Sequence, residues 1–163
     1  MRCKCLHRSF LRSYPLTSRR TNVVDIASFA LINCNNMKFV VDKCYASAAI
    51  ARNHDGICCG MRTRLGVSDA PVVAEADGFA LAVEVAIWRG FDSVISKGSS
   101  REIVNIESLA RSVNTVQFNF VPKSADSTAH TLAAHALSNN VQVEWTPDQI
   151  PGDLISKLGI MTS

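Results

Sequence analysis

The clearest hydrophobic pattern in the chain is a helical one near the middle of the sequence. Apolar residues recur every three to four positions and form one stripe, at Val72, Ala76, Phe79, Val83, Ala86 and Ile87. Pro71 suits the first turn of a helix, and Gly90 suits the position just past its end. The pattern therefore predicts a helix from about residue 71 to 88 that packs against a core, with Glu75 in its first turn.

Short apolar or alternating runs on both sides of this helix predict strands. Three precede it, at 38–44, 47–52 and 57–61. The Asp55–Gly56 step predicts a hairpin turn, because such turns need a positive φ. After the helix, the pattern predicts a strand, a helix, a strand and a helix, at 91–96, 99–111, 116–121 and 125–137. This order indicates one α/β domain, and 163 residues are enough for a proper core.

Charge is unevenly distributed along the chain. The formal net charge is +3, but residues 1–20 hold six Lys or Arg and no acid, so the remainder carries −3. The basic, Arg- and Ser-rich segment 1–36 is typical of an organelle presequence or a disordered leader. We therefore expect a domain at 37–140, followed by a tail at 141–163 that either docks or stays mobile. Net charge alone does not indicate nucleic-acid binding by the folded part.

No membrane partner is expected, because the apolar run 26–32 is too short to span a bilayer. No secretory signal is evident either. We therefore expect a protein of the nucleus or cytoplasm, or of an organelle if the leader is a presequence.

Three stretches together carry a resemblance to a known family: AEADGFALAVEVAIWRGF, VISKGSS and FNFVPKSADSTAHTLAAHAL. In their order and spacing they resemble the ribonuclease H-like domains common in plant genomes, which often derive from retroelement reverse transcriptases. The resemblance covers roughly residues 38–136. It implies a five-stranded mixed sheet flanked by helices on both faces, and an endonuclease that hydrolyses the RNA strand of an RNA–DNA hybrid.

The resembled family cuts phosphodiesters with two metal ions held by four acids. The resemblance places the first-strand acid at Asp42 and the first-helix acid at Glu75. It places the acid after the fourth strand at Ser99 and the last-helix acid at His130. Serine is a weak ligand for Mg²⁺, and a histidine nitrogen suits zinc or copper better. The implied metal site is therefore Asp42 and Glu75, for Mg²⁺ or Mn²⁺ if the protein is active.

Two observations bear on that site. Asp126 and Glu102 are acids near the degenerate positions, but a one-turn displacement of about 5.4 Å is large against metal–ligand distances of about 2 Å. We do not expect them to replace the lost ligands. Few residues separate Asp42 from Ser47, fewer than in the resembled family. Either the first hairpin is short, or Asp42 does not stand in the usual place.

Three residues are candidates for contacts to nucleic acid. Lys123 stands where the family usually has arginine and suits a phosphate, although an exposed loop lysine explains it equally well. Arg62 suits a backbone phosphate, with a solvated surface as the simpler explanation. Ser100 suits a sugar or phosphate contact, or a helix N-cap.

Three functional hypotheses follow. We favour a ribonuclease H-like domain that binds an RNA–DNA hybrid or another nucleic acid, with a degenerate metal site and weak or no catalysis. The first alternative is an active, metal-dependent RNA–DNA hybrid ribonuclease. The second is a protein-interaction module or retroelement remnant with no nucleic-acid role, because a fold does not establish a function.

Overall fold

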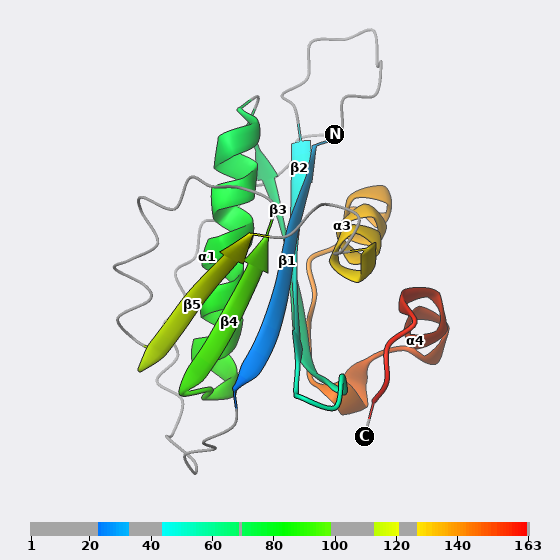
Figure 1. Ribbon diagram of the computed structural model, residues 1–163. Coiled ribbons are helices and arrows are strands. Elements are labelled where there is room, and N and C mark those ends of the chain that lie inside the picture. The colour runs from blue at the N-terminus through cyan, green and yellow to red at the C-terminus, as the bar shows by residue number, and fades with distance from the viewer. Residues whose placement is uncertain (1–22, 33–43, 69, 99–112, 121–126, 163) are drawn as a thin grey trace, which may run out of the picture.

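The computed structural model describes residues 23–32, 44–68, 70–98, 113–120 and 127–162 (Figure 1). In chain order its elements are β1 (Val24–Ile32), β2 (Cys44–Arg52), β3 (Cys58–Val67), α1 (Pro71–Arg89), β4 (Ser93–Gly98), β5 (Thr115–Phe120), α3 (Ser127–Asn139), β6 (Glu144–Trp145), the 3-10 turn η2 (Pro147–Gln149) and α4 (Gly152–Leu158).

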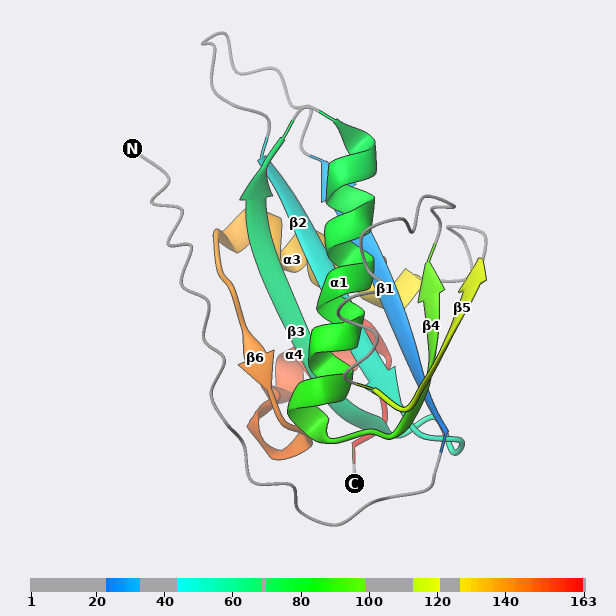
Figure 2. The same cartoon turned by 90° about the vertical axis from the view of Figure 1, so that its left-hand side faces the viewer.

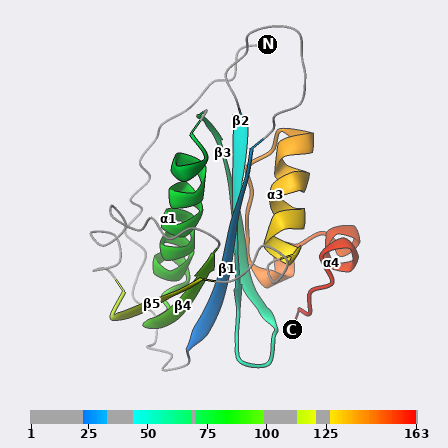
Figure 3. The same ribbon diagram turned by 45° about the horizontal axis from the view of Figure 1, so that its top comes forward.

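The strands form one mixed sheet in the order β5-β4-β1-β2-β3-β6. The central strand β1 runs antiparallel to β2 and parallel to β4. Helix α1 covers one face, and α3 and α4 lie on the other (Figures 1 and 3). This is the predicted mixed sheet with helices on both faces. It has six strands rather than five, because the two-residue β6 pairs with β3.

Two hydrophobic cores lie on the two faces of the sheet. Strand alternation sends Ala49 and Ala51 of β2 toward α1, and Ala48 and Ile50 toward α3 and α4. β2 is therefore buried on both faces, which explains why its sequence is a nearly continuous run of small and apolar residues.

Helix α1 confirms the predicted helix, but its first turn contains no acid, so Glu75 lies one turn later than predicted. Pro71 stands in its first turn, and Gly90 follows it in the left-handed conformation at φ 69°, with its N–H donating to the last turn. Phe79 is buried as predicted, but Val72 and Ile87 of the predicted stripe are 39% and 38% exposed. The buried face is centred on small residues instead, because the helix lies close against the alanine-rich β2.

β1 corrects the predicted domain organisation. It lies inside the segment 1–36 that we expected to precede the fold, yet Val24 and Ile26 are 3% and 0% exposed. The fold therefore includes residues before the predicted boundary at 37. The strand predicted at 38–44 is not the first strand of the sheet: β2 begins at Cys44, and 38–43 lie outside the described residues.

The segment predicted as a tail, 141–163, also belongs to the fold. It supplies β6, η2 and α4, and Leu154 and Leu158 of α4 are buried in the core beneath α3. The predicted strands at 91–96 and 116–121 appear as β4 and β5, and the last predicted helix appears as α3. The helix predicted at 99–111 lies outside the described residues. Within the described part of the chain, no helix is long and apolar enough to cross a membrane.

The position of β1 can be tested by side-chain truncation. Ile26→Ala removes a fully buried side chain from the core beneath α1, so we expect it to lower the free energy of unfolding by about 2–5 kcal/mol. Val23→Ala, three residues earlier and 48% exposed, should change it by less than about 0.5 kcal/mol. Urea unfolding followed by circular dichroism measures both. Equal effects of the two substitutions would show that this segment is not a core strand.

Candidate functional site

The end of β4 is where the candidate site is expected, because Ser99 follows Gly98 directly. Its parallel neighbour is β1, and the register pairs Ala27 with Lys97. Any ligand from the first strand must therefore come from β1 at or just after Ala27, on the face covered by α1. Figure 2 shows α1 lying across this face, with β4 and β5 on one side of it and β3 on the other.

Ser28 is the side chain of β1 that meets these conditions. It pairs with Ala49 of β2, which belongs to the core beneath α1, so both side chains point to that face. Ser28 is 3% exposed, and its Oγ donates a hydrogen bond to the Lys97 carbonyl at 3.1 Å. The first strand thus presents a neutral, already bonded hydroxyl beside the end of β4.

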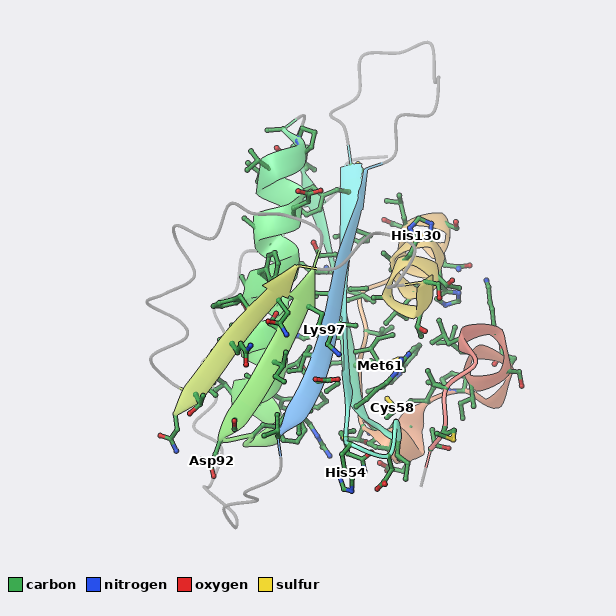
Figure 4. All side chains as sticks on the ribbon, in the orientation of Figure 1. His54, Cys58, Met61, Asp92, Lys97 and His130 are labelled. Carbon is green, nitrogen blue, oxygen red and sulfur yellow. The ribbon has the colours of Figure 1, made fainter. Side chains whose placement is uncertain are left out.

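The one acid among the described β1 residues, Asp25, lies elsewhere. It stands three residues before Ser28, about 10 Å along a strand, and alternation directs it to the opposite face. There its Oδ2 accepts from Lys97 Nζ at 2.6 Å. Figure 4 labels Lys97 on β4. Asp25 is therefore ion-paired with Lys97 of the neighbouring strand and does not face α1.

Glu75 is the α1 carboxylate that lies one turn from Phe79, on the side of the helix toward β4 and β5. It precedes Phe79 by one turn on the same side of the helix. The Phe79 ring meets Phe118 of β5 edge to face, with ring centroids 5.7 Å apart. Glu75 therefore lies on the side of α1 that faces β4 and β5, and it is half-buried.

Buried serine hydroxyls line the face of the central strands beneath α1, a feature that we did not predict. Ser28, Ser47 and Ser96 come from three different strands and are at most 3% exposed. Ser47 Oγ donates to the Ala74 carbonyl of α1 at 3.3 Å, whereas Ser96 Oγ has no hydrogen-bond partner. The available signal was a serine in each strand at the alternating positions that face the core, two residues from an apolar or small residue of the same face.

Most of the remaining predicted site residues cannot be placed relative to Glu75. Asp42, Ser99, Ser100 and Lys123 lie outside the described residues, as do Asp126 and Glu102. His130 is exposed on α3, on the opposite side of the sheet from α1 (Figure 4).

The described residues do not fit a pair of magnesium ions. Such a centre needs several carboxylate oxygens around each metal. At the end of β4 the described part of the chain offers Glu75 and the hydroxyl of Ser28. No group of three or more His, Cys, Asp or Glu side chains suited to a metal occurs among the described residues.

Arg62, a predicted nucleic-acid contact, belongs to an ion-pair network between β3, α1 and β6. Arg62 Nη1 lies 2.9 Å from Glu84 Oε2, and Arg62 Nε lies 3.1 Å from Glu144 Oε2. Arg64 Nη1 lies 2.7 Å from Asp77 Oδ1, and Arg64 Nη2 also bonds to Glu84. A phosphate contact by Arg62 would have to displace two carboxylates.

The network also fixes the charge of Arg64. Burial lowers the pKa of this guanidinium, but the carboxylates of Asp77 and Glu84 more than offset burial and raise the pKa above its usual value. The spacing was visible in the sequence: two arginines two residues apart on a strand, and two acids seven residues apart on a helix.

Solved structures similar to this chain are ribonuclease H1 domains. The ribonuclease H1 of the halophilic archaeon Halobacterium salinarum superposes with a TM-score of 0.63 at 18% identity, over 72% of this chain and 99% of its own. The N-terminal ribonuclease H domain of a Mycobacterium tuberculosis protein, solved as a fusion with maltose-binding protein, gives 0.62 at 15% identity, over 73% and 96%. LC11-RNase H1, solved in complex with an RNA/DNA hybrid, gives 0.61 at 13% identity, over 72% and 98%.

These likenesses establish the fold. No protein-family model matches the chain, and no curated protein matches its sequence. At identities of 13–18%, the chain has a ribonuclease H-like fold, and the likeness carries no activity with it.

The ion-pair network can be tested with a double-mutant cycle. Arg64→Ala leaves the half-buried Asp77 without its ion-pair partner and leaves Glu84 with Arg62 alone, so we expect it to lower the free energy of unfolding by about 1–3 kcal/mol. The cycle with Asp77→Ala should give a coupling free energy of about 0.5–2 kcal/mol. Lys157→Ala, on the exposed surface of α4, should be additive with Asp77→Ala to within about 0.5 kcal/mol. Additivity of the Arg64 and Asp77 substitutions would contradict the network.

Proposed function

We propose that this chain is a ribonuclease H-like domain that binds nucleic acid, with an RNA–DNA hybrid as its preferred ligand, and that hydrolyses it weakly or not at all. The observation that carries the proposal is Ser28, which stands beside the end of β4 where the first strand would have to supply a carboxylate. The sequence resemblance further supports an origin among retroelement-derived domains of plant genomes.

The fold supports the nucleic-acid part of the proposal. One structure that superposes on this chain was solved with an RNA/DNA hybrid. The narrow, deep major groove of an A-form duplex keeps side chains from its bases, so such a duplex is recognised mostly through its shape, its phosphates and the 2′-hydroxyls of the RNA strand. We therefore propose binding without base preference.

The side chains available to hold metal ions support weak or absent hydrolysis. Two-metal cleavage depends on carboxylates that hold both ions and so activate the attacking water. Ser28 offers a neutral hydroxyl, and Asp25 is on the wrong face and bound to Lys97. Two further positions of the resembled motif are Ser99 and His130. Glu75 is left without a second described carboxylate at its side.

Charge supports a modest affinity. Beyond the basic segment 1–20, the chain carries a net charge of −3. Three of its described cations, Arg62, Arg64 and Lys97, are already paired with carboxylates. Affinity for a polyanion depends on how many phosphates are neutralised. We therefore expect weak binding with a shallow dependence on salt.

The activity is tested with a labelled RNA–DNA hybrid duplex, incubated with the protein first in Mg²⁺ and then in Mn²⁺. We expect no cleavage above background by protein that circular dichroism shows to be folded. Glu75→Gln is the matched control, because it removes one charge and keeps the shape of the side chain. Efficient metal-dependent cleavage of the hybrid that disappears in Glu75→Gln would overturn the proposal in favour of an active ribonuclease.

Binding is tested in the same duplex by fluorescence anisotropy over a range of salt concentrations. We expect a measurable affinity that falls as salt is added and is unchanged between duplexes of different sequence. Glu75→Gln should bind at least as well as the wild type, because it removes a negative charge that would lie near phosphates. No salt-dependent binding to hybrid, duplex or single-stranded nucleic acid would instead indicate a protein-interaction module.

A further inference from the structure

The two edges of the sheet differ in how they are protected. At one edge, β6 has two residues, carries the ion-paired Glu144 and is followed by Pro147. Short length, charge and proline are the usual devices that prevent a strand from being added to an edge. At the other edge, β5 has six residues, Thr-Val-Gln-Phe-Asn-Phe, with no charge and no proline. Among the described strands, β5 is therefore the edge strand that carries none of these protective devices.

The backbone of β5 shows which groups are available. The Thr115 N–H donates to the Asp92 carbonyl at 3.0 Å, on the side of β4. Because the ladder alternates, Thr115, Gln117 and Asn119 direct their N–H and C=O groups to β4. Val116, Phe118 and Phe120 direct theirs outward, and no described strand pairs with them.

We propose that β5 docks a second copy of this chain, through antiparallel pairing of β5 with β5 about a two-fold axis. The alternation places the axis at Phe118, which pairs with its own counterpart, while the backbone of Val116 pairs with that of Phe120. In this register the outward N–H and C=O groups of one β5 bond to those of the other, which gives about six backbone hydrogen bonds. One continuous sheet then runs through both copies.

Charge and side-chain chemistry favour a second copy as the occupant. In a two-fold pair an edge strand whose charges share one sign meets the same sign on its copy, so such strands resist pairing with themselves. β5 carries no charge. The same register brings Gln117 opposite Asn119 of the second copy, two amides that each both donate and accept. Within one copy these amides already match, since Gln117 Nε2 donates to Asn119 Oδ1 at 3.1 Å.

Packing of β5 against the core beneath α1 holds this edge strand in place. Val116 and Phe118 are partly buried against the core beneath α1, and the Phe118 ring rests edge to face on Phe79. The strand is therefore held in an extended conformation before it meets a partner, which lowers the entropic cost of pairing. Because two six-residue strands bury less than the roughly 1,200 Å² of a standard interface, the dimer is weak and depends on concentration.

The proposal is tested by sedimentation equilibrium of the nuclease-treated full chain over a range of concentrations. We expect the mass to rise from 17.7 kDa toward twice that value. The double variant Gln117→Lys with Asn119→Lys places like charges directly opposite across the two-fold, and should weaken the dimer by at least about tenfold. So should Gln117→Glu with Asn119→Glu. An equimolar mixture of the two variants should recover the dimer, because each lysine then faces a glutamate.

The matched control is Ser138→Lys, on the exposed surface of α3, which adds a charge away from β5 and should leave the dimer unchanged. A wild-type chain that stays monomeric at every concentration would overturn the proposal. So would a dimer that both double variants leave intact, or a mixture that stays monomeric although each variant is folded. No nucleic acid takes part in the experiment, so its outcome is independent of the proposed binding function.

Discussion

The parallel pairing of β1 with β4 is the contact on which the rest of the structure depends. β1 joins the antiparallel hairpins of β2 and β3 to the parallel pair β4 and β5, and both cores are built against this centre. The register of this pairing also decides the chemistry. Because Ala27 lies opposite Lys97, the face covered by α1 receives Ser28, and Asp25 is turned to the other face. A shift of one residue would exchange those two faces.

Helix α1 and the turn between β2 and β3 could be predicted from short stretches of sequence. Pro71 and Gly90 mark both ends of α1, and the apolar periodicity between them is that of a helix. Asp55 and Gly56 form the predicted turn between β2 and β3, with Gly56 at φ 78°. Such features are set by φ, sterics and side-chain spacing over a few residues, so the sequence reveals them without knowledge of the tertiary contacts.

The sequence analysis did not predict strand β1, because this strand forms through pairing with residues far away in the sequence. Val24 and Ile26 alternate with a polar residue as a strand requires, but they follow a basic segment whose composition is typical of a leader. What makes this run a central strand is pairing with residues some 25 and 70 positions away. The same limit applies to Arg62. Its pairing with Glu84 and Glu144 depends on the position of α1 over β3, which no local pattern specifies.

The side chains that join β1 to β4 avoid an accumulation of like charges. Several carboxylates gathered at one site repel each other when no metal is bound, so a functional cluster costs folding free energy. Ser28 places a neutral hydroxyl at a buried position beside β4, and this hydroxyl donates to the Lys97 carbonyl. Lys97 in turn pairs with Asp25 across the same two strands. A neutral hydroxyl and an ion pair thus strengthen the β1–β4 pairing without gathering like charges.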